Sequence, residues 1–96
     1  MASYDWFLMN LKKIGNPNAK DIGRTVYVIE NIYTVKEAVI MNVEFGLARL
    51  KVFDKKEKSH HYKSVYYKNM NKTWFTTKEI AEKIAEQRLT DWVVNE

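Results

Sequence analysis

Apolar and polar residues alternate through residues 25–33 and predict a strand there. Val26 and Val28 fall on one face of this strand, and Tyr27 falls on the other face. Alternation of this kind is typical of a strand that buries one of its two faces. We therefore expect a strand that carries valines on its inner side and a tyrosine on its outer side.

A β-hairpin is predicted further along the chain. Its first strand covers residues 47–53, where small or aliphatic residues alternate with Arg49, Lys51 and Phe53. The charged stretch 54–59 supplies the turn, and residues 62–68 return as the second strand. A third, short strand is predicted at residues 72–75.

Residues 34–46 lie between these strands and predict a helix. Thr34 and Glu37 have the spacing of a capping box, and Gly46 stands where a helix terminator would. The segment is also rich in β-branched residues, which favour a strand and leave that alternative open: Val35, Val39, Ile40 and Val43.

A second helix is predicted to begin with the capping-box pattern of residues 76–79 and to continue as an amphipathic stripe. Residues 89–94 then predict a closing strand. At the other end, residues 4–14 carry large apolar groups on both faces and predict an added N-terminal strand. The chain's single proline, Pro17, lies in the loop that follows it.

From residue 25 onward, the expected order is strand, helix, strand, strand, helix, strand. This order is typical of ferredoxin-like α+β folds, in which two helices cover one face of an antiparallel sheet. Ninety-six residues suffice for one core but not for two. We therefore expect a single domain over residues 1–96, with an added strand and loop at 1–24 and a ferredoxin-like core at 25–96.

Composition narrows the classes of function. The formal net charge of +4 favours a polyanionic partner, either nucleic acid or an acidic protein surface. The absence of cysteine excludes disulfides, thiol nucleophiles and cysteine-ligated metals. No apolar run is long enough to span a membrane, so we expect a cytoplasmic protein without a membrane partner. Homodimerisation stays open, and the lysine- and asparagine-rich composition is compatible with a phage or viral source.

Several residues resemble the RNA-recognition motif family. Val26-Tyr27-Val28, followed by Asn31, is similar to the family's first strand, and Phe45-Gly46 is similar to the end of its first helix. In its third strand the family has a basic residue, spaced aromatics and a valine. The positions that match here are His60, Tyr62, Val65 and Tyr67. The resemblance implies RNA binding on the open face of the sheet.

The chain also departs from that motif. Ser64 occupies the position of the second aromatic residue, and His61 and Lys63 replace two small residues. These departures remove one stacking ring from the family's pattern. Any binding surface must therefore be argued from the other residues of this face.

One face of the expected sheet combines aromatic rings with cations. If the strand valines, with Leu50 and Tyr67, face the helices, the opposite face exposes a binding platform for single-stranded nucleic acid. Bases stack on aromatic rings, and cations meet the phosphates. Lys63 and Lys68 are further candidate cations, although Lys63 alternates to the other face. The predicted nucleic-acid-binding residues are Tyr27, Arg49, Lys51, Phe53, Tyr62 and Tyr66.

Other functions find less support in the sequence. The adjacent His60 and His61 point to opposite faces of a strand, so we expect no metal site. His60 with Asp54 or Glu57 could form an acid–base pair, yet no nucleophile or phosphate-binding glycine loop accompanies them. A helix-turn-helix over residues 74–81 lacks its recognition helix. We expect neither catalysis nor a cofactor. The alternative is a module that binds and inhibits or modulates another protein.

Overall fold

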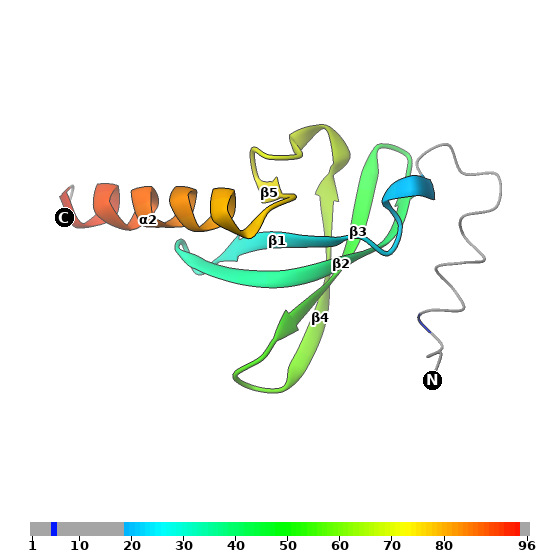
Figure 1. The fold of residues 1–96 in the computed structure, drawn as a ribbon, viewed down its shortest axis with the longest axis horizontal. Coiled ribbons are helices and arrows are strands. Elements are labelled where there is room, and N and C mark those ends of the chain that lie inside the picture. The colour runs from blue at the N-terminus through cyan, green and yellow to red at the C-terminus, as the bar shows by residue number, and fades with distance from the viewer. Residues whose placement is uncertain (1–4, 6–18, 95–96) are drawn as a thin grey trace.

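The computed structural model describes residue 5 and residues 19–94. These residues form a five-stranded antiparallel sheet with the strand order β4-β3-β2-β1-β5 (Figure 1). The strands are β1 (Thr25–Glu30), β2 (Thr34–Glu44), β3 (Leu47–Asp54), β4 (Ser59–Tyr66) and β5 (Trp74–Phe75). The helical elements are the 3-10 turns η1 (Ala19–Asp21) and η2 (Tyr67–Asn69) and the helix α2 (Lys78–Val94). The predicted N-terminal strand lies, apart from Asp5, outside the described residues.

The predicted helix over residues 34–46 is wrong, because this segment forms the long strand β2. Its β-branched residues favour the extended conformation, and the alternative prediction of a strand is confirmed. Phe45 and Gly46 form the two-residue turn to β3, with φ angles of 54° and 76°. Positive φ at both positions is the signature of a type I′ hairpin turn. Gly46 thus adopts the expected left-handed conformation in a hairpin rather than at a helix end.

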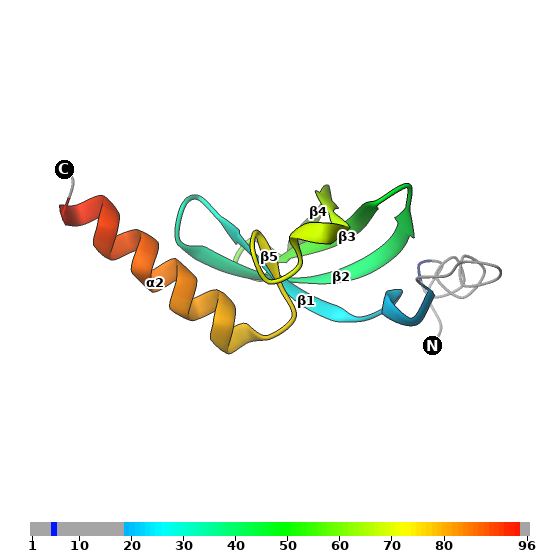
Figure 2. The same cartoon turned by 90° about the horizontal axis from the view of Figure 1, so that it is seen from above.

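The predicted closing strand over residues 89–94 is also wrong, since α2 continues through it. Residues 78–94 contain neither glycine nor proline, so nothing in the backbone stops a helix once it has begun. Figure 2 shows that α2 runs outward beyond the sheet. Only its first half buries residues against the strands, through Ala81 and Ala85, whereas Trp92 and Val93 are exposed.

The ferredoxin-like fold class is therefore contradicted. The described residues contain one α-helix rather than two, and β1 to β4 follow one another as a simple antiparallel meander. The hairpin of residues 47–68 is confirmed, with β3 and β4 paired along their whole length. The fold is a β-rich sheet with a single C-terminal helix.

The inner face of the sheet carries the main core. It contains fully buried residues from β1, β2, β3 and β5: Val26, Val28, Ala38, Ile40, Val43, Ala48, Leu50, Val52 and Trp74. Val65, Tyr67 and Met70 pack against this cluster. The Trp74 indole Nε1 donates a hydrogen bond of 2.8 Å to the carbonyl oxygen of Tyr66. Since Trp74 and Tyr66 belong to strands at opposite edges of the sheet, the sheet must curl until these two edges meet.

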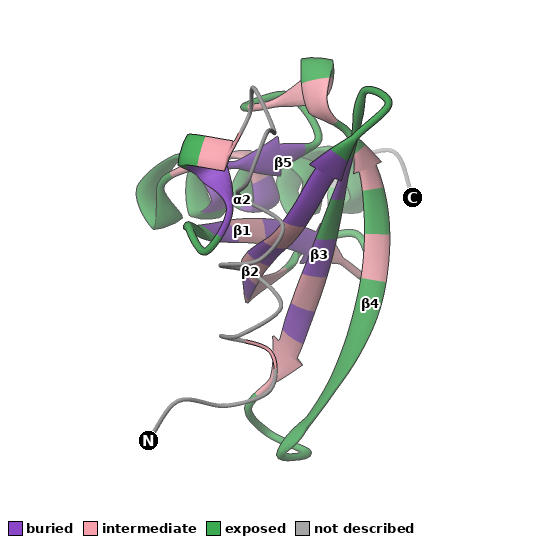
Figure 3. Ribbon diagram, turned by 90° about the vertical axis from the view of Figure 1, so that its right-hand side faces the viewer, coloured by how far each residue is buried: buried purple, intermediate pink, exposed green. Residues whose placement is uncertain are grey.

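The predicted division of the strands into two faces holds, but the position of the helix does not. Every residue assigned to the covered side lies in or against the inner cluster, yet α2 packs on the other, outer face. There, Ile29 and Phe75 contact Ala81 and Ala85 in a second, smaller cluster. Figure 3 shows the buried residues concentrated on β1, β2, β3 and β5, while β4 is largely exposed.

Candidate functional site

Five of the six predicted binding residues lie together on the outer face of the β3–β4 hairpin. Lys51 stands opposite Tyr62, and Leu47 stands opposite Tyr66. Directly paired residues of antiparallel strands point to the same face, and residues two apart do so along each strand. The face that results carries Arg49, Lys51, Phe53, Tyr62 and Tyr66. His60, opposite Phe53, belongs to it as well.

Tyr27 lies on the same outer face but does not join this group. It pairs with Glu37 across the β1–β2 ladder, and it is half-buried against the cluster that holds α2. Helix α2 therefore covers the Tyr27 end of the outer face and leaves the β3–β4 end open. The predicted platform is split into an exposed part and a helix-covered part.

Two tyrosines on β4 present exposed rings that are each paired with a cation. The side chains of Tyr62 and Tyr66 have relative exposures of 44% and 60%. The guanidinium carbon of Arg49 lies 5.1 Å from the centre of the Tyr62 ring. Lys68 Nζ lies 5.7 Å from the centre of the Tyr66 ring. We call these four residues the β4 platform.

Two further residues belong beside the platform. His60 packs edge-to-face against Tyr62, with 5.7 Å between the ring centres. The period-two alternation of β4 places His60 on this face, although His60 was not among the predicted binding residues. Lys68 follows β4 in η2, where strand alternation no longer indicates a direction. Its place over Tyr66 could therefore not be read from the sequence.

Lys51 and Phe53 are less available than predicted. Lys51 Nζ forms an ion pair with Asp5, and it lies 5.9 Å from the centre of the Phe53 ring. Both residues are only partly exposed. An external phosphate would have to compete with Asp5 for the Lys51 ammonium. We therefore treat these two residues as the inner border of the platform.

A charged network crosses the opposite, inner face near the same hairpin. Lys36 Nζ lies 3.2 Å from Glu30 Oε1 and 3.3 Å from Asp54 Oδ2. His61 Nε2 lies 2.9 Å from Glu30 Oε2, and Lys63 Nζ lies 3.8 Å from the same oxygen. As predicted, Lys63 therefore belongs to the inner side. The network ties β1, β2, β3 and β4 together where the hydrophobic core ends.

The network shifts the pKa values of its members. Burial alone would raise the pKa of Glu30, but hydrogen bonds and charge from His61 and Lys36 outweigh it, so the pKa is lowered. The backbone amide of Glu57, 3.1 Å from Asp54 Oδ1, is the main cause of the lowered pKa of Asp54. The hydrogen bond to Glu30 raises the pKa of Lys36. All three shifts favour the charged forms, as expected of a structural ion network.

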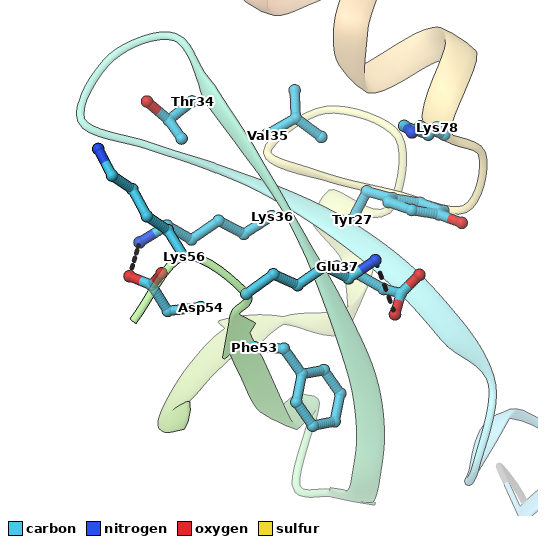
Figure 4. A pocket seen from close by; sticks show the side chains of 10 residues that line it. Tyr27, Thr34, Val35, Lys36, Glu37, Phe53, Asp54, Lys56 and Lys78 are labelled. Atoms are coloured by element: carbon cyan, nitrogen blue, oxygen red, sulfur yellow. Dashed lines mark hydrogen bonds and ion pairs between the residues drawn. The ribbon is translucent and has the colours of Figure 1, made fainter. Parts of the chain in front are cut away.

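A hollow opens between Tyr27 and Phe53, where the β3–β4 turn, the start of β2 and the start of α2 meet (Figure 4). Its volume is about 290 Å³. Lysines gather around it, and Glu37 lies between the two rings. The residues that line it include Tyr27, Glu37, Phe53, Lys55, Lys56 and Lys78. We call this cavity the Phe53 hollow.

Two groups that the sequence offered for acid–base chemistry, Asp54 and His60, have other contacts in the structure. Among residue 5 and residues 19–94, no group of three or more His, Asp or Glu side chains could hold a metal ion. Asp54 is engaged by Lys36 and by the Glu57 amide, whereas His60 packs on Tyr62.

No helix within the described ranges is long and apolar enough to cross a membrane.

Comparisons with models of protein families, with curated proteins and with solved structures found no match for this chain.

Proposed function

We propose that this protein binds single-stranded nucleic acid, RNA in the first place, through the β4 platform. The observation that carries the proposal is the pairing of each exposed tyrosine with its own cation, Tyr62 with Arg49 and Tyr66 with Lys68. A stacked base and its neighbouring phosphate need a flat ring and a positive charge within a few ångströms of each other.

The cations of the platform are available for phosphate. Among the described residues, neither Arg49 nor Lys68 forms an ion pair with a carboxylate. Their contacts are the tyrosine rings, and exposed cation–π contacts contribute only about 0.5–1 kcal/mol. A phosphate therefore replaces weak contacts rather than strong ones. A stacked base contributes roughly 1–3 kcal/mol in return.

The position of β4 suits an extended strand of nucleic acid. β4 is the edge strand of the sheet, and its residues 59–62 are all exposed. Helix α2 lies at the opposite end of the outer face and does not cover it. A ligand can therefore follow β4 from His60 past Tyr62 to Tyr66, where Lys68 of η2 lies beside it.

The dependence of binding on salt tests this function. Contacts of Arg49 and Lys68 with two single-strand phosphates predict a log–log slope of about −1.4, which is a loss of roughly sevenfold between 50 and 200 mM salt. Fluorescence anisotropy with labelled oligouridine and oligothymidine measures this slope directly. No saturable binding to either oligonucleotide at 50 mM salt would contradict the proposal.

A second candidate function rests on Phe45. This residue is 98% exposed at the tip of the β2–β3 hairpin, and Leu47 and Tyr66 form an exposed pair beside it. An exposed phenylalanine beside other apolar side chains is typical of a protein-binding anchor. In this reading the protein binds and modulates another protein that has an acidic surface. A stoichiometric protein partner that survives nuclease treatment and is lost with Phe45→Ser would favour this candidate.

A further inference from the structure

The Phe53 hollow has the size and lining of a small-ligand site. Ligand pockets generally measure about 300–1,000 Å³, and the volume of the hollow, about 290 Å³, lies just below that range. Figure 4 shows Tyr27 and Phe53 on either side of the first part of β2, with Glu37 between them. The hollow therefore offers two flat apolar walls and a carboxylate. This combination fits a small planar ligand that carries hydrogen-bond donors.

The charge around the hollow favours an anion. Four lysines and two carboxylates line it, which leaves an excess of positive charge. Lys36 forms ion pairs with Glu30 and Asp54, whereas the other three lysines form only weak ion pairs or none with the described residues. Lys55 lies 3.9 Å from Glu37, and Lys78 lies 3.8 Å from Glu82. Exposed ion pairs at such distances contribute little to stability, so a phosphate can recruit these lysines.

Lys56 is the cation that is free to bind. It lines the hollow and forms no ion pair among the residues that the structure describes. It stands beside Lys55 in the turn between β3 and β4, and Lys55 forms an ion pair with Glu37 of β2. Figure 4 shows the Lys56 side chain extending to the Thr34 side, away from Phe53, so a phosphate that meets Lys56 lies at the rim of the hollow. The hollow thus joins aromatic walls to an anion-binding rim.

We propose that the Phe53 hollow binds a nucleoside monophosphate unit. The base lies against Phe53 and Tyr27, an amino group of the base donates to Glu37, and the phosphate meets Lys55 and Lys56 at the rim of the hollow. Carboxylates accept hydrogen bonds from the amino group of cytosine, whereas uracil presents a carbonyl oxygen at that position. The hollow therefore prefers a cytidine phosphate to a uridine phosphate. None of the β4 platform residues lines the hollow, so this site does not rest on the function proposed above.

Titrations of the full-length protein with CMP, UMP, cytidine and inorganic phosphate, followed by ¹⁵N NMR, test the site. CMP is expected to shift the amides around Glu37 and Phe53 and to bind more tightly than the other three. Lys56→Ala should raise the Kd for CMP about tenfold, because one charge-assisted hydrogen bond is lost. The matched control Lys72→Ala removes an exposed lysine outside the hollow and should leave binding unchanged. Glu37→Gln should reduce the preference for CMP over UMP.

Two oligonucleotides distinguish the source of the nucleotide. If the hollow takes the end of a strand, a 5′-phosphorylated oligocytidine binds more tightly than its unphosphorylated form, and Lys56→Ala removes the difference. If it takes a free nucleotide, CMP binds and the two oligonucleotides do not differ. Either result supports the site. The absence of a saturable CMP shift, equal binding of phosphate and CMP, or CMP binding that Lys56→Ala leaves unchanged would overturn it.

Failure of this site can be told apart from failure of the platform. Tyr62→Ala should weaken oligonucleotide binding and leave CMP binding unchanged, because Tyr62 does not line the hollow. Lys56→Ala changes a surface lysine and is expected to fold normally, so its result stays interpretable. Phe53→Leu provides a second variant, with thermal unfolding as the check on its fold.

Discussion

Trp74 and Phe75 are neighbours in β5, yet each is fully buried on a different face of the sheet. Trp74 lies in the inner cluster and closes the curled sheet by its hydrogen bond to the Tyr66 carbonyl. Phe75 lies in the outer cluster and fastens α2 to β1. A two-residue strand therefore stabilises both the sheet and its helix. Its hydrogen bond also holds Tyr66, the last residue of β4 and one of the two tyrosines of the β4 platform.

The closure at Trp74 can be tested by removing a single donor. Trp74→Phe leaves an aromatic ring in the inner cluster but takes away the N–H group that serves Tyr66. We expect a loss of about 1–3 kcal/mol in the free energy of unfolding, because a buried hydrogen bond is removed and a smaller ring leaves space behind. Urea unfolding measures the loss. An unchanged free energy of unfolding would contradict a stabilising role for this hydrogen bond.

The attachment of α2 predicts a different outcome for Phe75→Ala. The change removes the largest fully buried side chain of the outer cluster, so we expect a cost of about 3–5 kcal/mol. Because Ala81 and Ala85 lose their main contact, helical circular dichroism should melt before the sheet does. A single cooperative transition for helix and sheet would show that α2 is held by something other than Phe75. Val93→Ala, an exposed change on α2, is the control.

The inner-face network predicts how stability depends on pH. The pKa of Glu30 and of Asp54 is lowered in the folded protein. Their stabilising contribution is thus fully present above the ordinary carboxyl pKa of about 4 and is lost as the pH falls through the folded values. We expect the free energy of unfolding to fall below about pH 4. Glu30→Gln should flatten this dependence, whereas Glu79→Gln on the exposed face of α2 should not.

Substitution of Phe45 at the tip of the β2–β3 hairpin is expected to stabilise the protein. Phe45 has a φ of 54° and is almost wholly exposed, so its conformation costs energy that no burial offsets. Asparagine before glycine is the preferred pair in a type I′ turn. Phe45→Asn should therefore stabilise the protein by up to about 1 kcal/mol, measured by urea unfolding. Gly46→Ala should destabilise it by about 1–2 kcal/mol through backbone strain alone, since space around Gly46 is open.

The sequence predicted the faces of the strands because period-two alternation is a local property. Val26, Val28, Leu50 and Val52 could be assigned to one side without knowledge of the fold, and the predicted binding residues of the opposite side followed from them. This is why five of the six predicted residues stand together on the β3–β4 hairpin, although the fold class was wrong.

The error over residues 34–46 has a different origin. Thr34 and Glu37 match a capping box, but in the folded protein Thr34 pairs with Glu30 and Glu37 pairs with Tyr27. These are contacts between strands, and a local motif does not record them. The placement of α2 was missed for a related reason. Tyr27 and Ile29 are apolar enough to pack against a helix, but no local pattern indicated which face of β1 the helix would cover.

The most direct test of the proposed function compares three tyrosines of the same chain. Tyr62 and Tyr66 belong to the platform, whereas Tyr33 is 46% exposed in the loop between β1 and β2. In anisotropy titrations with a labelled single-stranded RNA at 50 mM salt, Tyr62→Ala and Tyr66→Ala should each raise Kd by roughly 5- to 150-fold, the loss of one stacked base. Tyr33→Ala should leave Kd unchanged. Equal effects of all three substitutions, or none from Tyr62→Ala and Tyr66→Ala, would contradict binding at the β4 platform.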